Sequence, residues 1–254
     1  MNDFNEKDIS MTFLKGMKVL ECFSGIDRAM SISEIAKKTD LNRTVTRRLV
    51  LTLEHLKYLE STDRRYSLTP RILRVAGGFL QGHDIGKHVT PILKSFSDKI
   101  KESISFVMLD EDRAIYVAHS PGDQRLITQG FTIGSTLPLH ATGLGRAILA
   151  FCPEDRQKEL LKKSPCASYT NNTTVDPEKL KSDLTLTRAR SYALVINEFE
   201  EGVTSLAVPV LHQDGELIGA VGIVGPNPRF QDEKKRQERL NVLHECAEEI
   251  AMLV

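Results

Sequence analysis

The chain has 254 residues, 41% hydrophobic and 27% charged, which is typical of a soluble globular protein and unlike a disordered chain or a disulfide-bonded miniprotein. Its first residues are polar and acidic, and no apolar run approaches the ~18 residues of a membrane span, so we expect a cytoplasmic protein without membrane contact. The net charge is zero, yet residues 11–80 carry 13 Lys and Arg against 7 Asp and Glu, which predicts a polyanionic partner for this segment.

The N-terminal segment predicts short helices followed by a strand pair. Ser31 and Glu34 have the spacing of a capping box, and Asn42 can cap the next helix after a tight turn. The predicted elements are helices at residues 13–23, 32–38 and 43–58, strands at 58–60 and 65–68, and a linker helix at 71–80 broken by Gly77 and Gly78. We therefore expect a winged helix-turn-helix at residues 11–70 and a linker helix at 71–87.

The helix predicted at residues 43–58 has the layout of a DNA recognition helix. Four apolar residues fall on one face at about 100° per residue: Val45, Leu49, Leu53 and Leu56. The other side and the flanks carry the predicted DNA contacts Arg43, Thr44, Thr46, Arg47 and Arg48. Arginine can read guanine with two hydrogen bonds, and threonine can contact phosphate or the thymine methyl group.

An ordinary amphipathic helix with a solvated basic face would show the same pattern. The neighbouring features favour DNA, because the helix follows a capped helix and a turn and precedes a basic hairpin. At the tip of that hairpin, Arg64 and Arg65 are predicted to grip the DNA backbone or the minor groove like a wing.

Residues 88–254 alternate between strand and helix patterns, which predicts a mixed antiparallel sheet flanked by helices in an α+β sensor-like domain. The helices are expected at residues 89–101, 140–151, 154–162, 176–190 and 231–253. The strands are expected at residues 105–110, 114–119, 125–133, 191–196, 205–211 and 217–224, the last two joined as a hairpin across residues 213–215.

Several motifs in order resemble the IclR family of bacterial regulators. They are residues 13–59, 65–70, 137–147, 200–203, 207–210 and 221–226. The sequences Arg47-Arg48-Leu49 and Leu68-Thr69-Pro70-Arg71 are most similar to the subgroup that controls protocatechuate and p-hydroxybenzoate breakdown. The resemblance implies a GAF-like domain that binds a small carboxylate, and dimers or dimers of dimers on palindromic operators.

The resemblance also implies where the effector binds: the turn at Gly143 and Leu144, the strand region before Gly202, and the strand that ends at residues 225–226. Family members often have an acidic run where this chain has Val195-Ile196-Asn197-Glu198, and some have serines where it has Gly222 and Val224. These differences make the expected site more apolar, which favours an aromatic acid over a very small polar acid.

Residues 143–145 do not form a nucleotide loop, because Ile148 replaces the third glycine. Their amides could hold a carboxylate at the helix N-terminus or could only pack. Asn197, Glu198 and Ser205 are candidates to line the effector site, although each also suits a loop cap or a surface position. His140 is expected to be structural, and Arg146 is expected to make a structural ion pair or an interface contact.

Arg125 is our candidate for the side chain that anchors the carboxylate. It opens the strand predicted just before the 137–145 segment, with Leu126 among the apolar neighbours of the ring. An arginine fork pairs well with a buried carboxylate, which needs a partner. A solvent-facing arginine at a strand edge is the alternative.

Two other functions remain open. One is an enzyme of sensor fold, for instance thiol-dependent, fused to a DNA-binding head; the other is a constitutive DNA-binding dimer without an effector. The four cysteines lie far apart and the histidines form no metal-binding spacing, so we expect no metal, no cofactor and no disulfide framework.

Overall fold

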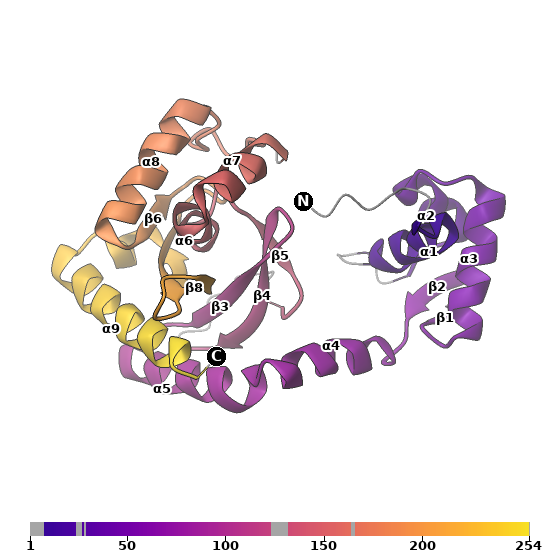
Figure 1. Cartoon of the computed structure of the whole chain (residues 1–254), viewed down its shortest axis with the longest axis horizontal. Coiled ribbons are helices and arrows are strands. Elements are labelled where there is room, and N and C mark those ends of the chain that lie inside the picture. The colour runs from indigo at the N-terminus through magenta and orange to yellow at the C-terminus, as the bar shows by residue number, and fades with distance from the viewer. Residues whose placement is uncertain (1–7, 24–26, 28, 123–131, 164–165, 254) are drawn as a thin grey trace. The chain divides into compact units, whose positions relative to one another are not determined.

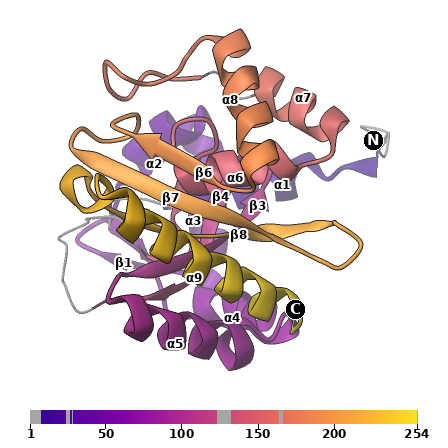
Figure 2. The ribbon, with the colours of Figure 1, turned by 90° about the vertical axis from the view of Figure 1, so that its left-hand side faces the viewer.

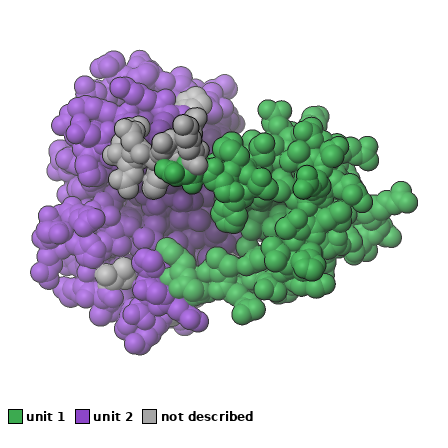
Figure 3. Space-filling view, turned by 45° about the vertical axis from the view of Figure 1, so that its right-hand side comes forward, with its two compact units in different colours: residues 1–79 green, residues 80–254 purple. Residues whose placement is uncertain are grey.

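The computed structural model describes residues 8–23, 27, 29–122, 132–163 and 166–253 (Figure 1). The chain divides into two compact units, Met1–Phe79 and Leu80–Val254, which Figure 3 colours separately. The division falls inside the segment expected to be the linker, residues 71–87. None of the helices in the described part of the chain has the length and apolarity to cross a membrane.

The first unit is a winged helix-turn-helix, as predicted. Its elements are α1 (Met11–Glu21), α2 (Ile32–Thr39), α3 (Arg43–His55), β1 (Leu59–Thr62) and β2 (Arg65–Leu68). The two strands pair antiparallel, and a bridge from Met30 to Tyr66 joins the wing to the segment before α2. Val19, Ile35 and Val50 bring one side chain from each helix into the common core.

Local capping sets the turn between α2 and α3. Glu34 accepts a hydrogen bond from the Ser31 amide at 2.7 Å while the Glu34 amide donates to the Ser31 hydroxyl, which confirms the capping box. Asp40 ends α2 in the left-handed region at φ 54°, and Asn42 Oδ1 accepts a hydrogen bond from the Val45 amide at 2.9 Å. These caps satisfy helix-end groups and fix the direction in which α3 leaves the turn.

The linker helix α4 (Ile72–Gly82) runs without a break through Gly77 and Gly78, so the predicted interruption is wrong. Glycine costs a helix roughly 1 kcal/mol relative to alanine, which weakens the helix but does not end it. A short π-helix, η2 (Ile85–Val89), follows and leads into α5 (Thr90–Ile100).

The second unit is built on a six-stranded antiparallel sheet in the order β5-β4-β3-β8-β7-β6. Its strands are β3 (Ile104–Asp110), β4 (Arg113–Ser120), β5 (Thr136–Pro138), β6 (Ala193–Ile196), β7 (Val203–Leu211) and β8 (Leu217–Pro226). Its other elements are α6 (Gly143–Phe151), α7 (Glu154–Lys163), α8 (Pro177–Arg190), η3 (Asn227–Phe230) and α9 (Glu233–Ala251). The predicted α+β class is confirmed.

Helices cover both faces of this sheet. Alternate residues of β7 and β8, such as Leu206 and Val221, pack with α5 and α9 on one face, where Figure 2 shows both helices. The opposite face presents small residues, among them Ala207 and Ala220, to α6. Small side chains let α6 approach the strands closely, and α8 packs against α6 from outside.

Two sequence expectations need correction around α6. The predicted strand at residues 125–133 lies mostly outside the described residues, and its described end, residues 132–133, has no strand structure. Helix α6 begins at Gly143 and not at residue 140, because Thr142 caps it by accepting a hydrogen bond from the Gly145 amide at 3.1 Å. Strand β5 was missed, since three residues that end in Pro138 give no alternating pattern.

Two glycines seat the start of α6. A Cβ atom on Gly145 would lie 2.5 Å from the Cα and carbonyl oxygen of Leu139, and one on Gly143 would lie 2.6 Å from Ser205 Oγ. The Thr142 hydroxyl also donates to the Pro138 carbonyl at 2.8 Å. The first turn of α6 is therefore wedged between the segment after β5 and strand β7.

We expect Gly145→Ala to lower the free energy of unfolding of the second unit by roughly 1–3 kcal/mol, because the added methyl group meets backbone atoms that cannot move aside. Gly82→Ala is the control: nothing lies within 4 Å of its Cβ position, so it should stabilise by about 0.4–1 kcal/mol. Urea unfolding measures both, and equal midpoints for the two variants would contradict the close packing of α6.

Candidate DNA interface and effector site

The exposed side of α3 carries most of the predicted DNA contacts. Arg43, Thr44, Arg47 and Arg48 are all exposed in the first two turns of the helix. The Asn42 cap starts the helix at Arg43. Three guanidinium groups and one hydroxyl thus share a surface that can meet a DNA groove.

Thr46 does not belong to that surface. Its side chain is 0% exposed, and its hydroxyl donates to the Asn42 carbonyl at 3.0 Å within the helix. The buried face of α3 is made by Thr46, Leu49 and Val50, so it is rotated from the face predicted through Leu56, which is 46% exposed. Val45 and Leu53 are partly buried against the same core, so the predicted face fails only at Leu56, the C-cap residue at the end of α3.

The two wing arginines have different surroundings. Arg64 lies in the turn between β1 and β2 with φ 62° and is exposed. Arg65 donates to the Ala29 carbonyl at 2.7 Å and lies 3.3 Å from a Glu34 carboxylate oxygen. Arg65 therefore ties the wing to the start of α2, whereas Arg64 extends from the tip.

The first turn of α6 meets strand β7 at Ser205. Ser205 is 8% exposed, and its hydroxyl is a buried side-chain oxygen without a hydrogen-bond partner among the described residues. Thr142 satisfies the amide of Gly145, while the described part of the chain offers no acceptor to the amides of Gly143 and Leu144. Helix-end amides and a buried hydroxyl without a partner are groups that can hydrogen-bond to an anionic oxygen.

The sheet register brings the other expected effector residues to the same face. Ser205 pairs directly with Val195 on β6 and with Val224 on β8, so the three side chains share one face of the sheet. Gly222 pairs with Ala207 one step along, and a Cβ there would lie 2.6 Å from the Leu206 carbonyl oxygen. Gly222 thus serves close strand packing, whereas Val224 is half-buried and supplies apolar surface.

Asn197 and Glu198 have other partners, so we do not retain them as direct effector contacts. Asn197 Oδ1 accepts hydrogen bonds from the Gly202 amide at 2.9 Å and from Asn227 Nδ2 at 2.7 Å, which closes the turn between β6 and β7. The Glu198 carboxylate pairs with Arg146 at 2.5 Å. The expectation that Arg146 forms a structural ion pair is confirmed.

Arg125 and Leu126 lie outside the described residues. Their assignment to the effector site therefore stays a prediction from the sequence.

The titratable groups near α6 do not form a catalytic arrangement in the described part of the chain. Burial lowers the pKa of His140, whose Nε2 lies 2.9 Å from the Ala167 carbonyl oxygen and so donates to it. Burial raises the pKa of the Cys152 thiol to about 11 and that of Cys246 to about 12. A thiol nucleophile needs the opposite shift.

Family models match both units. The model described as "Bacterial transcriptional regulator IclR C-terminal" matches residues 77–252, and the model described as "IclR helix-turn-helix domain" matches residues 13–63. The chain belongs to the IclR family of bacterial transcriptional regulators. The resemblance seen in the sequence is thereby confirmed.

Similar IclR-family proteins cover nearly the whole chain. The Pca operon regulatory protein of Acinetobacter baylyi is 34% identical over 242 residues, 93% of this chain and 86% of the relative. The p-hydroxybenzoate hydroxylase transcriptional activator of the same organism is 30% identical over 257 residues, 99% of this chain and 94% of the relative. The Acinetobacter PobR inducer-binding domain, solved as a double mutant with 3-hydroxybenzoic acid, matches at 30% identity and TM-score 0.60 over 65% of this chain and 96% of its own length.

Sequence patterns did not predict the polar contacts beside α6. Thr170, Thr173 and Thr174 hydrogen-bond to Asn197 and Glu198 across the domain. These residues lie in an irregular segment between α7 and α8, where neither periodicity nor charge indicates a tertiary contact. The only available signal was the pair of charges on Arg146 and Glu198 in otherwise apolar surroundings.

We expect Ser205→Ala to raise the free energy of unfolding of the ligand-free protein by about 1 kcal/mol, because it removes a buried hydroxyl without a partner. Thr142→Ala is the matched control: its hydroxyl makes two hydrogen bonds at the start of α6, and its loss should cost about 1 kcal/mol. Thermal unfolding without ligand measures both, and an equal loss of stability in the two variants would show that Ser205 already has a partner.

Proposed function

We propose that this IclR-family regulator binds operator DNA through α3 and Arg64, in the cytoplasm, and that an aromatic carboxylate bound at α6 and Ser205 controls its activity. The main support for this proposal is the unpaired Ser205 hydroxyl, which lies against the start of α6 and its free amides of Gly143 and Leu144. A native protein leaves few buried polar groups unpaired, and those it leaves are often completed by a ligand or an ion.

A carboxylate suits this place better than a neutral ligand. The amides of Gly143 and Leu144 point out of the positive end of the α6 dipole, and Ser205 can donate a third hydrogen bond. These groups are held rigidly by the glycine contacts, so binding requires little reorganisation. Arg125, if it reaches the site as the sequence predicts, would add the charged partner.

The apolar surroundings favour an aromatic acid. Val195 and Val224 flank Ser205 on the sheet face, and Leu144 in the first turn of α6 is fully buried. Such walls stabilise a ring by removing its apolar surface from water. The names of similar proteins point to the same class, since one solved relative holds 3-hydroxybenzoic acid and one curated relative is an activator of p-hydroxybenzoate hydroxylase.

A homodimer, or a dimer of dimers, completes the proposal. The first unit exposes large apolar side chains on α1 and α4, which a second copy would cover. They are Met11, Phe13, Leu14 and Met17 on α1, and Leu73, Val75 and Phe79 on α4. Two copies would present two α3 helices to the half-sites of a palindromic operator.

The two alternative functions have less support. A thiol-dependent enzyme is disfavoured because burial raises the pKa of the cysteines, Cys22 and Cys166 included. A constitutive DNA-binding dimer would not explain why the buried Ser205 hydroxyl has no hydrogen-bond partner among the described residues. We assign no cofactor or metal to the chain.

A thermal-shift screen of benzoate, 3-hydroxybenzoate, 4-hydroxybenzoate and protocatechuate tests the effector site. At a ligand concentration one hundred times the Kd, binding stabilises the native state by about 2.7 kcal/mol. We expect at least one of these acids to stabilise the wild type, and Ser205→Ala to reduce that shift although its ligand-free stability is not lower. If none of them stabilises the wild type, the aromatic-carboxylate proposal is wrong.

Arg47→Ala tests the DNA interface. Loss of a base-reading guanidinium should cost about 1–3 kcal/mol on the cognate operator and much less on random DNA. Lys181→Ala removes the same charge from the exposed side of α8 and serves as the control. Fluorescence anisotropy at several salt concentrations gives both affinities, and equal losses on operator and random DNA would show that Arg47 reads no base.

A further inference from the structure

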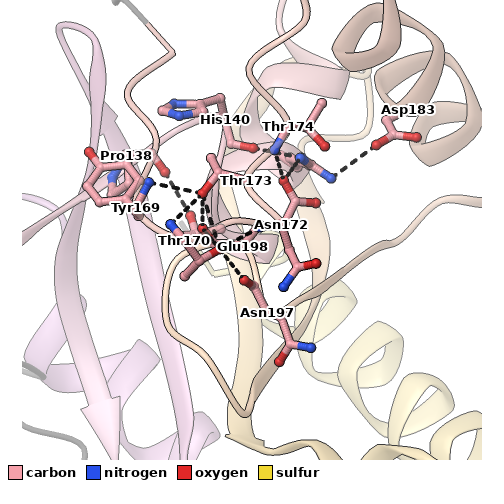
Figure 4. A network of polar contacts seen from close by, with 12 residues as sticks. Pro138, His140, Tyr169, Thr170, Asn172, Thr173, Thr174, Asp183, Asn197 and Glu198 are labelled. Atoms are coloured by element: carbon pink, nitrogen blue, oxygen red, sulfur yellow. Dashed lines mark hydrogen bonds and ion pairs between the residues drawn. The ribbon is translucent and has the colours of Figure 1, made fainter.

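Arg146 is a charged side chain buried inside the second unit. It is 3% exposed and has three acceptors in three different segments. Its Nε donates to the His140 carbonyl at 2.7 Å, one Nη lies 3.2 Å from Asp183 on α8, and the other lies 2.5 Å from Glu198. Figure 4 shows this network from close by.

Glu198 also binds a second segment, residues 170–174. The carboxylate oxygen that pairs with Arg146 also accepts a hydrogen bond from the Thr174 amide at 2.7 Å. The Glu198 carbonyl accepts from the Thr173 hydroxyl and the Asn197 carbonyl accepts from the Thr170 hydroxyl, each at 2.5 Å. One carboxylate therefore holds the 170–174 segment against the turn that follows β6.

The two ends of the ion pair belong to the two walls of the effector site. Arg146 is one turn after Gly143 on α6, and its bond to the His140 carbonyl fixes the turn from which the free amides project. Glu198 follows β6 directly, three residues after Val195, which pairs with Ser205. The ion pair thus joins the helix that offers the amides to the turn between β6 and β7, and Ser205 lies on β7 just after that turn.

We propose that Arg146 and Glu198 are positioning residues for the effector site, holding the Gly143 and Leu144 amides at the spacing from Ser205 that a carboxylate requires. The inference rests on the proposed effector site. Neither side chain touches the ligand; the charge on Glu198 acts through Arg146. A buried pair is suited to this role because it has one low-energy geometry, in which each charge requires the other.

Glu198→Gln tests the proposal, since it keeps the shape of the side chain and removes its charge. The probe is 4-hydroxybenzoate, or whichever acid of the four-member screen stabilises the wild type. Glu102→Gln is the matched control: Glu102 is also buried and pairs with Arg229 and Arg239, at the start of β3. Both variants should lose stability, so stability alone does not separate the two roles.

Calorimetric titration with the acid distinguishes a positioning role from a merely structural one. We expect Glu198→Gln to weaken binding about tenfold, comparable to the loss of a partner that orients a metal ligand, and Glu102→Gln to stay within about twofold of wild type. Equal affinities in Glu198→Gln and wild type, or equal losses in the two variants, would overturn the proposal. If Glu198→Gln does not fold, Arg146→Lys keeps the positive charge without the fork, and wild-type affinity in that variant would likewise overturn it.

Hydrogen exchange of the ligand-free protein gives a readout that does not depend on the effector. Glu198→Gln should speed exchange in peptides covering residues 140–147 and 168–174, and Glu102→Gln should leave these peptides unchanged. Should no acid bind the wild type, this result would still support the positioning role while the proposed effector class fails. Unchanged exchange at residues 140–147 would contradict the role even if the wild type binds a ligand.

Discussion

The close approach of α6 to strand β7 is the contact on which the effector domain depends. It exists because Gly143 and Gly145 carry no side chain: a Cβ atom at either position would clash with Ser205 or Leu139. The sheet face below also offers small alanine side chains. Thr142 then fixes the helix start with two hydrogen bonds. The same contact that packs the core places the start of α6 against the buried Ser205 hydroxyl, so the proposed effector site would share its structural origin with the core packing.

Charge is used differently in the two units. In the first unit the arginines of α3 are exposed and free to meet a polyanion, while Arg65 is engaged by Glu34 at the start of α2. In the second unit Arg146 is buried and neutralised by Glu198 and Asp183. Surface guanidinium groups can exchange water for phosphate at low cost, whereas a buried one organises its surroundings.

The winged helix-turn-helix followed from local signals, since capping residues and periodicity act over a few neighbours: Ser31, Glu34 and Asn42 all cap as predicted. The buried face of α3 could not be placed as well, because Thr46 satisfies its hydroxyl within the helix and packs like an apolar residue. In the second unit, the sequence offered Asn197 and Glu198 both as effector-site candidates and as loop caps or surface groups. The Glu198 carboxylate pairs with Arg146 and with the Thr174 amide, 52 and 24 residues away, and local periodicity does not identify partners at such separations.

The proposed effector contact is a carboxylate bound at the amides of Gly143 and Leu144, at the start of α6. The most direct measurement is a nitrogen-proton correlation spectrum of protein labelled with nitrogen-15 glycine and leucine, recorded during titration with the acid that stabilises the wild type. The account predicts that the amide protons of Gly143 and Leu144 move downfield as they gain a charged acceptor, and that this shift is smaller in Ser205→Ala. Saturable binding that leaves both amides unshifted would contradict it.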